Sequence, residues 1–246
     1  MKFTRWYALL TILLVVLSLA LYLAQVLIFE QPRDTLFYFF QDLAFLPIQV
    51  LLVTMILNDL LARREKRARL NKMNMAIGAF FGEMGSELIS RLKDFDRRAA
   101  DRQAALALGA DWGPERFIRA RRELAGSQPD IDPRAGDLEP LRDFLMAKRS
   151  FLLSLLENQN LLEHQSFTDL LWAASHLAEE LRLRTDIASL PDNDLDHLAG
   201  DIRRVYSLLL AEWLSYAAHL QKAYPYMYSL MVRNNPLAGE ARVIFQ

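Results

Sequence analysis

The stretch WYALLTILLVVLSLALYLAQVLIF, from Trp6 to Phe29, contains no charged residue. A helix of this length rises about 36 Å, which is enough to cross the roughly 30 Å hydrocarbon core of a bilayer. A cleaved signal peptide is the alternative, with Lys2 and Arg5 as its basic region. Signal peptides, however, have apolar cores of about 7–15 residues, and here a second apolar segment follows at once. The sequence therefore favours an uncleaved membrane anchor.

The second apolar segment begins after a short polar break, EQPRD at Glu30–Asp34. Pro32 cannot continue the first helix because proline lacks an amide hydrogen, and the Asp and Thr that follow can cap a new helix. Two helices joined by so short a connection must be antiparallel neighbours. The sequence therefore predicts a hairpin of two transmembrane helices, which comprises residues 1–62 with spans at about 6–29 and 36–61.

Basic residues are distributed unevenly around this hairpin. Lys2 and Arg5 precede the first span, and the connection carries only Arg33. The segment ARREKRARLNK after the second span adds Arg63, Arg64, Lys66, Arg67, Arg69 and Lys72. Positive charge concentrates on the cytoplasmic side of membrane proteins, so both termini are expected in the cytoplasm. The cluster is a stop-transfer signal, and it can also contact anionic lipid headgroups.

Polar residues interrupt the second span. Gln49 follows Asp42 at a spacing that places both on nearly the same helical face, and Pro47 between them can kink the helix. An ionisable residue at membrane depth is a functional candidate. The favoured interpretation is that Asp42 reaches water near the interface while Gln49 hydrogen-bonds the first helix or a second copy. The alternative is that both residues line an oligomeric pore or ion path.

Helical periodicity dominates the rest of the chain, with the clearest apolar faces at about 138–159, 166–184 and 191–222. The second of these opens with a capping pattern at Ser166–Asp169. The turn-rich segment GSQPDIDPRAG, residues 126–136, is the best candidate for a boundary. We therefore expect an all-α protein in which the hairpin precedes basic juxtamembrane and stalk helices at 63–125, a cytoplasmic helical bundle at 137–232 and a C-terminal tail at 233–246.

Three glycines lie on a helical pattern just after the basic cluster, at Gly78, Gly82 and Gly85. Glycine inside a helix is less favourable than alanine by about 1 kcal/mol. Their presence suggests close approach by another helix, and they are predicted to be helix-packing residues.

The segment Trp213–Pro236 is rich in aromatic residues, namely Trp213, Tyr216, Tyr224, Tyr226 and Tyr228. Such side chains are enriched at protein interfaces. They are equally ordinary in the core of a small helical bundle, and core packing is the favoured interpretation. A surface for a partner or for self-association is the alternative.

The composition excludes several classes of chemistry. Without cysteine there are no disulfides and no thiolate metal sites. The net charge of −1 gives no general attraction to nucleic acid, and no nucleic-acid partner is expected. The sequence also lacks the phosphate-binding loop, the dinucleotide fingerprint, the nucleophile elbow and the zinc-protease motif. No catalytic residue and no cofactor is therefore predicted.

Four histidines lie in the predicted bundle, at His164, His176, His197 and His219. Metal sites in bundle cores use paired Glu-x-x-His elements, and none occurs here. The nearest patterns are the reversed pair His176–Glu179 and the pair Asp194–His197. Capping or surface roles are favoured, and no metal ligand is assigned.

Three stretches together resemble a known family. They are AFLPIQVLLVTMILNDLL at Ala44–Leu61, NMAIGAFFGEMGSEL at Asn74–Leu88 and YPYMYSLMVRNNP at Tyr224–Pro236. They resemble a family of uncharacterised prokaryotic membrane proteins with two N-terminal spans and a helical cytoplasmic domain. The resemblance implies a location in the prokaryotic plasma (inner) membrane, and it implies no activity, substrate or site residue.

Three functions remain open from the sequence. The favoured one is a membrane-anchored interaction or regulatory module that contacts lipid and associates with itself, with a further protein partner open. The second is an oligomeric ion channel or transport component in which the second span lines the path. The third is a membrane-tethered, metal-dependent enzyme.

Overall fold

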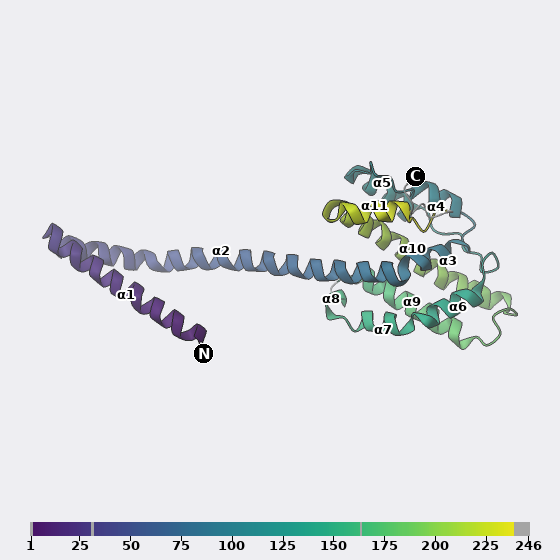
Figure 1. Ribbon diagram of the computed structural model, residues 1–246, viewed down its shortest axis with the longest axis horizontal. Helices are drawn as coiled ribbons and strands as arrows, with labels where there is room; N and C mark the ends of the chain where they lie inside the picture. The colour runs from purple at the N-terminus through teal and green to yellow at the C-terminus, as the bar shows by residue number, and fades with distance from the viewer. Residues whose placement is uncertain (1, 31, 163, 239–246) are drawn as a thin grey trace. The chain divides into compact units, whose positions relative to one another are not determined.

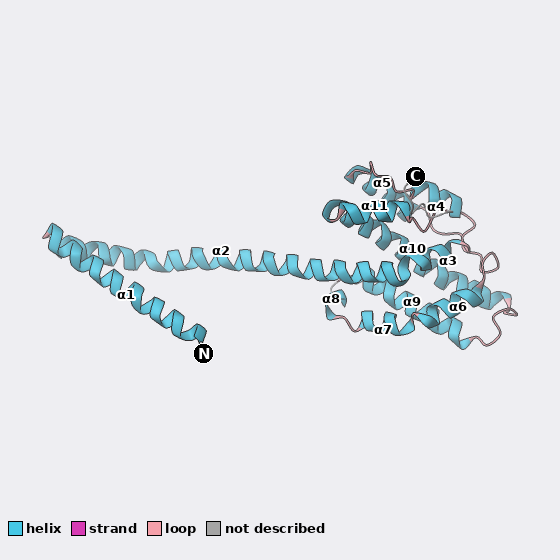
Figure 2. Ribbon diagram, viewed as in Figure 1, coloured by secondary structure: helices cyan, strands magenta, loops and turns pink. Residues whose placement is uncertain are grey.

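The computed structural model describes residues 2–30, 32–162 and 164–238, and it consists of helices joined by loops (Figures 1 and 2). The all-α prediction is confirmed, since the only extended pairing within those ranges is an isolated bridge between Asp96 and Ile131. The chain divides into two compact units, Met1–Lys66 and Arg67–Gln246. The side chains of Lys2, Arg5 and Tyr7 lie outside the described part.

The first unit contains α1 (Lys2–Phe29) and the beginning of α2 (Pro32–Phe80). Between them Glu30 adopts a left-handed backbone conformation with φ of 51°. Its amide donates to the carbonyl of Val26 at 3.0 Å, which ends α1 with a left-handed C-terminal turn. Pro32 then opens α2, where its fixed φ suits the first helical position.

The second unit begins within α2 and contains ten further helical elements. They are η1 (Phe81–Gly85), a π-helical turn, followed by α3 (Ser86–Lys93), α4 (Ala99–Ala105), α5 (Pro114–Gly126), α6 (Leu138–Ala147), α7 (Arg149–Leu156), α8 (Gln159–Leu162), α9 (Gln165–Leu183), α10 (Asp192–Ala223) and α11 (Pro225–Arg233). The long helix α10 is central, because α9, α3, α5 and α11 all pack against it (Figure 1).

Apolar periodicity explains this arrangement. On α10, buried residues recur every three or four positions, as at Ile202, Val205 and Leu209. Buried residues recur in the same way on α9, at Leu170, Ala174, Ala178 and Leu181. Each helix therefore presents one continuous apolar stripe, and the two stripes meet in the core.

The segment 126–136, which was predicted to be a boundary, lies inside the second unit. The amide of Arg97 donates to the carbonyl of Asp130 at 3.0 Å, and the amide of Asp132 donates to the carbonyl of Phe95 at 2.8 Å. Turn-rich composition marked this segment as a loop, but its backbone pairs with the α3–α4 connection. The structure therefore joins the predicted stalk and bundle into one unit.

A buried ion pair holds this region together. Arg102 and Asp96 are both almost fully buried, and the guanidinium donates to both carboxylate oxygens. The guanidinium also donates to the carbonyls of Ser127 and Gln128, at 2.9 and 3.0 Å. Asp96 accepts further hydrogen bonds from the amides of Arg98 and Asp130. Every charge is thus matched by a partner, as a buried pair requires.

The loop between α4 and α5 is closed by side chains from the C-terminal part of the chain. Tyr228 donates to the carbonyl of Gly109 at 2.8 Å, and Asn235 donates to that of Leu106 at 3.0 Å. Gln221 donates to the carbonyl of Trp112. Backbone carbonyls in this loop are therefore satisfied by residues more than a hundred positions later.

Arg184 links the end of α9 to the beginning of α10. Its guanidinium donates to both carboxylate oxygens of Asp194 at 2.7 and 2.6 Å, and to Glu180 at 2.7 Å. The hydrogen bond from Arg184 is the main reason that the pKa values of Glu180 and Asp194 lie below their usual range. Reciprocally, these carboxylates raise the pKa of Arg184, chiefly through Asp194.

Removing one partner of the Arg102–Asp96 pair should destabilise the second unit strongly. Arg102→Ala leaves a buried carboxylate uncompensated, for which about 3–5 kcal/mol is expected. The measurement is chemical denaturation of the full-length protein, followed by tryptophan fluorescence. Arg98→Ala is the matched control, because Arg98 is half exposed in its pair with Asp101 and should contribute less than about 1 kcal/mol. Equal losses in both variants would contradict this assignment.

Acid should weaken the Arg184 link. A carboxyl group whose pKa is lower in the folded state stabilises the fold above its unfolded pKa, and this contribution disappears as the pH falls through the folded pKa. The Tm of the wild-type protein should therefore fall more between about pH 6 and pH 3 than that of Arg184→Met, although the variant is less stable at the higher pH. Arg182→Met, which removes the exposed pair with Glu179, is the control and should change the acid response less. A wild-type acid response equal to that of Arg184→Met would refute the link.

Candidate functional site

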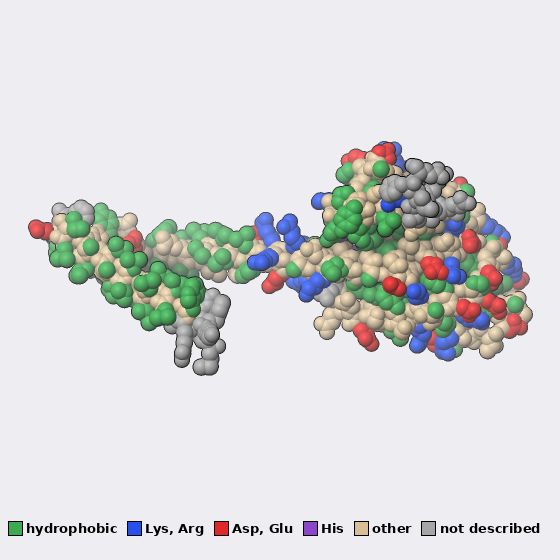
Figure 3. Space-filling view, viewed as in Figure 1, with side chains coloured by type: hydrophobic (Ala, Val, Ile, Leu, Met, Phe, Trp, Pro, Cys, Tyr) green, Lys and Arg blue, Asp and Glu red, His purple; other side chains and the backbone are tan. Residues whose placement is uncertain are grey.

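Two N-terminal helices are long and apolar enough to cross a membrane. The first candidate span is Leu9–Ile28, and the second lies in the helix that begins at Pro32. None of the apolar window in either helix is buried inside the protein. Large side chains such as Leu27 and Leu51 are exposed, and hydrophobic side chains cover α1 and the first part of α2 in Figure 3. The apolar window of each helix is therefore left uncovered by the described part of the protein.

Within the first unit, Asp42 contacts α1. Tyr22 donates to its carboxylate at 3.4 Å and packs edge-on against Phe39. Ser18 and Gln25 of α1 line the same shallow hollow. Gln49 is exposed, and α2 continues through Pro47 without ending. The structure thus brings Asp42 to polar residues of α1 and leaves Gln49 apart from them.

The basic residues after the second apolar segment are all exposed, namely Arg63, Arg64, Lys66, Arg67, Arg69 and Lys72. Arg63 forms an ion pair with Asp59 at 2.9 Å, one helical turn earlier. Exposed pairs of this kind contribute little stability. The cluster therefore lies on the solvent-exposed surface of α2.

The three predicted helix-packing glycines lie in different surroundings. A Cβ atom on Gly85 would approach the rings of Phe80 and Phe81 to 2.7 Å, and both rings are buried. At Gly78 it would lie 2.7 Å from the hydroxyl of Tyr216, whereas at Gly82 it would meet nothing within 4 Å. The close neighbours are aromatic side chains rather than the backbone of another helix.

The aromatic residues near the C-terminus divide into two groups. Trp213 and Tyr228 are buried, so they belong to the core and cannot form an interface without unfolding. Burial is also the main cause that raises the pKa of Tyr228 to about 12. Tyr224 and Tyr226 are exposed, and Tyr216 is half buried. The favoured interpretation of core packing thus fits Trp213 and Tyr228, and the alternative of an interface remains a prediction for the other three.

A cleft of about 290 Å³ lies among α2, α10 and α11 in the second unit. Tyr216 forms one wall and stacks on Phe81, with ring centroids 5.4 Å apart. Asn74 and His219 form a polar edge, 3.5 Å apart, and burial lowers the pKa of His219. The remaining lining is mostly apolar, from Asn71, Met75, Gly78, Ala79, Leu220, Tyr224 and Met227.

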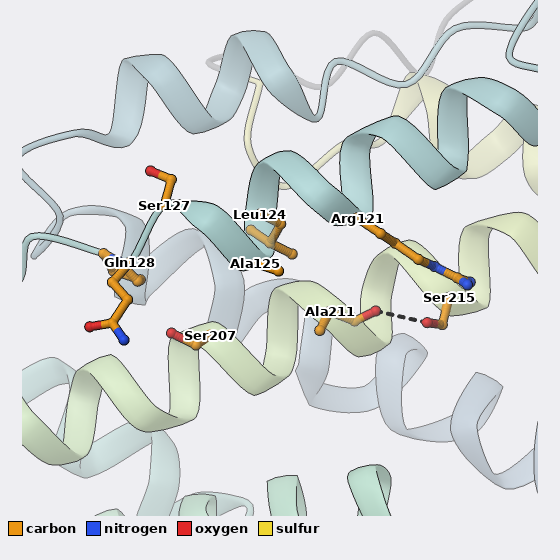
Figure 4. Close-up of a pocket in the computed structure, with 9 residues that line it drawn as sticks. Arg121, Leu124, Ala125, Ser127, Gln128, Ser207, Ala211 and Ser215 are labelled. Atoms are coloured by element: carbon orange, nitrogen blue, oxygen red, sulfur yellow. Dashed lines mark hydrogen bonds between the residues drawn. The ribbon is translucent and has the colours of Figure 1, made fainter.

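A second cleft, of about 430 Å³, lies between α5 and α10 (Figure 4). Leu124 and Arg121 reach it from α5, and Ser207 and Ser215 reach it from α10. The hydroxyl of Ser215 donates to the carbonyl of Ala211, one turn earlier. Among the described residues, those that line this cleft include no histidine and no carboxylate.

The four histidines have different environments. His164 caps α9 by accepting the amide of Phe167 at 3.2 Å, and His219 lies at the edge of the smaller cleft. His176 and His197 meet beside Asp201, on facing sides of α9 and α10. Spacings of three residues, as in Glu-x-x-His, do not predict this group, because its members lie on two separate helices. The detectable signal was a spacing of four, as in His176 with Glu180 and His197 with Asp201.

Alanine substitutions should separate Gly85 from Gly82. Gly85→Ala forces a methyl group against two buried rings, and overpacking of this kind destabilises by about 1–3 kcal/mol. Gly82→Ala meets open space, and the better helix propensity of alanine should leave stability unchanged or raise it by up to about 1 kcal/mol. Denaturation midpoints of the two full-length variants test this. A larger loss at Gly82 than at Gly85 would contradict the packing described above.

Comparisons with known proteins identify the family. A family model described as "Uncharacterized protein MJ1433, C-terminal helical domain" matches residues 69–233, and one described as "MJ1433, N-terminal helical domain" matches residues 2–61. Uncharacterized protein MJ1433 of Methanocaldococcus jannaschii is 41% identical over 240 residues, which cover 98% of this chain and 96% of the relative. No solved structure matches the chain.

These matches cover nearly the whole sequence, and they confirm the resemblance to a family of uncharacterised proteins. The chain therefore belongs to the MJ1433 family, whose members contain an N-terminal and a C-terminal helical domain.

Proposed function

We propose that this protein is a membrane-anchored interaction module whose second unit associates with a second copy of the chain. The observation that carries the anchor is the complete exposure of two apolar helical windows. Moving a large aliphatic side chain out of water is favourable by about 1.5–3 kcal/mol. A bilayer around α1 and the first part of α2 would cover dozens of such side chains.

The orientation proposed from the sequence places both termini in the cytoplasm. Its support is the basic cluster after the second span, where all six side chains are exposed. Near an anionic membrane surface each basic residue contributes about 1 kcal/mol. Lipid headgroups are therefore the proposed partners of this cluster, in a prokaryotic plasma membrane.

Self-association is proposed to use an exposed aromatic face, defined here as Met75, Tyr224, Tyr226, Met227 and Leu230. Met75 and Tyr226 are each more than 70% exposed, at 74% and 73%. The rings of Tyr224 and Tyr226 contact each other with centroids 6.4 Å apart, and the face borders the smaller cleft.

Methionine and tyrosine are enriched at protein interfaces, and contiguous exposed apolar patches mark interaction sites. A second copy suits this face because a two-fold contact uses the same patch on both subunits. Self-association through this face needs no other protein. A different protein partner would be the conclusion if the purified chain stays monomeric.

The anchor and the self-association have separate tests. Full-length protein should stay in the membrane fraction after alkaline carbonate extraction, and its release would refute the anchor. Light scattering in nanodiscs, corrected for lipid, should give a dimer or larger species. A monomer would refute self-association and leave the anchor intact.

Tyr226→Ser combined with Met75→Ser should weaken self-association by about tenfold or more, because central apolar anchors contribute more than 1 kcal/mol each. Trp172→Ser is the matched control, since Trp172 is an exposed aromatic on α9, outside the proposed face. The concentration dependence of mass in detergent measures both. If Trp172→Ser weakened self-association equally, the effect would come from loss of any exposed apolar side chain and not from the proposed face.

An oligomeric ion path is the second candidate, and one observation favours it. Ser18, Tyr22, Gln25 and Asp42 gather around one hollow between the two helices of the first unit. An intramembrane carboxylate with polar neighbours is a candidate ion-pathway residue. Ion flux through reconstituted wild-type protein, abolished by Asp42→Asn, would support this candidate. A protein without flux, or smaller than a tetramer, would reject it.

A further inference from the structure

We propose that His176, His197 and Asp201 form a binding site for a divalent transition-metal ion, with Zn²⁺ as the best match. Imidazole and carboxylate are both zinc ligands, and a set of three leaves a fourth position for water. The site lies in the second unit and is independent of the proposed anchor and aromatic face.

The three side chains are held by two facing helices. His176 projects from α9, and His197 and Asp201 project from α10 at a spacing of one helical turn. The contributed ligand atoms all lie within 4.8 Å of one another. The Nε2 atoms of His176 and His197 each lie 3.4 Å from the same carboxylate oxygen, Oδ2 of Asp201.

Asp201 supplies a second, independent observation. Its side chain is only 7% exposed, although it carries a carboxylate. Its Oδ2 atom is buried and accepts no hydrogen bond within the described part of the chain. Buried carboxylates are normally paired or bound to metal, and this oxygen, which has no hydrogen bond and faces two imidazoles, is placed to accept a cation.

The spacing of the ligand atoms suits zinc. Ligand atoms at about 2.0–2.2 Å from a tetrahedral ion are separated by about 3.3–3.6 Å. The two nitrogen-to-oxygen distances already fall in this range. Rotations of the imidazole rings would bring their two ligand nitrogens to the same separation from each other. The rings are 47% and 53% exposed, so an ion can enter from solvent.

The surrounding charges also favour a cation. Glu180 approaches the Nε2 atoms of His197 and His176 at 3.5 and 3.8 Å, and Arg184 holds it in place. Arg184 in turn binds Asp194, and Arg204 lies 3.7 Å from the other oxygen of Asp201. With neutral imidazoles, three carboxylates face two guanidinium groups. This leaves one net negative charge for the ion.

Each part of this group has a role in the proposed site. His176, His197 and Asp201 bind the ion, and the carboxylate of Glu180 adds negative charge beside the same Nε2 atoms. Arg184 is a positioning residue, because it acts through Glu180. A bound ion would join α9 to α10 at a second point along their interface, and it would stabilise the folded unit.

The test is zinc binding by full-length protein in nanodiscs, purified without a histidine tag. Isothermal titration calorimetry with Zn²⁺ should give one ion per chain, and elemental analysis after dialysis should give the same ratio. His176→Ala, His197→Ala and Asp201→Asn should each weaken binding by about 100-fold or more, because outer-shell partners alone are worth 10–100-fold.

Two matched variants control for fold and for nearby charge. His164→Asn removes an imidazole and keeps a good helix cap, and Glu179→Gln removes an exposed carboxylate of α9 that pairs with Arg182. Both should bind Zn²⁺ within about tenfold of the wild type. Co²⁺ should give visible absorption typical of tetrahedral coordination in the wild type and lose it in His176→Ala.

Three results would overturn the site. They are no Zn²⁺ binding by folded wild-type protein, binding unchanged in all three ligand variants, and equal losses in the two control variants. The circular dichroism spectrum of each variant, compared with the wild type, separates loss of ligands from loss of fold. A rise in Tm with Zn²⁺ that the ligand variants lack would be the independent confirmation.

Discussion

The buried contact between Arg102 and Asp96 organises the middle of the second unit. A buried guanidinium needs a hydrogen-bond acceptor for each of its N–H groups. Arg102 finds these acceptors in Asp96 and in the carbonyls of Ser127 and Gln128. These contacts fix the segment after α5 against the α3–α4 connection. Since α5 also packs on α10, the position of one ion pair determines how a long loop closes the core.

Apolar residues are used in opposite ways by the two units. In α10 they form a stripe that is buried against α9, α3, α5 and α11. In α1 they surround the whole helix and are exposed. A helix that is apolar on all sides has no preferred face to bury within a small protein. This contrast supports a different solvent for each unit.

The sequence predicted the elements whose signals are local, and it missed those that depend on distant partners. The bounds of α9 and α10 differ from the predicted ones by about one residue, because a regular apolar stripe defines each helix. Ser166, however, does not act as the predicted cap. It donates to Glu212 of α10, and His164 caps the helix instead. The pairing of segment 126–136 and the meeting of His176 with His197 likewise need the folded arrangement of separate helices.

The hydrogen bonds that close the α4–α5 loop can form only late in synthesis of the chain. Tyr228 and Asn235 complete hydrogen bonds to carbonyls that were synthesised 119 and 129 residues earlier. Domains fold as units during synthesis, and these carbonyls stay exposed to water until α11 and Asn235 have left the ribosome. Helix α11 and Asn235 therefore close this loop only after the rest of the second unit has been synthesised up to them. A chain that lacks these two side chains would leave both carbonyls to bind water instead.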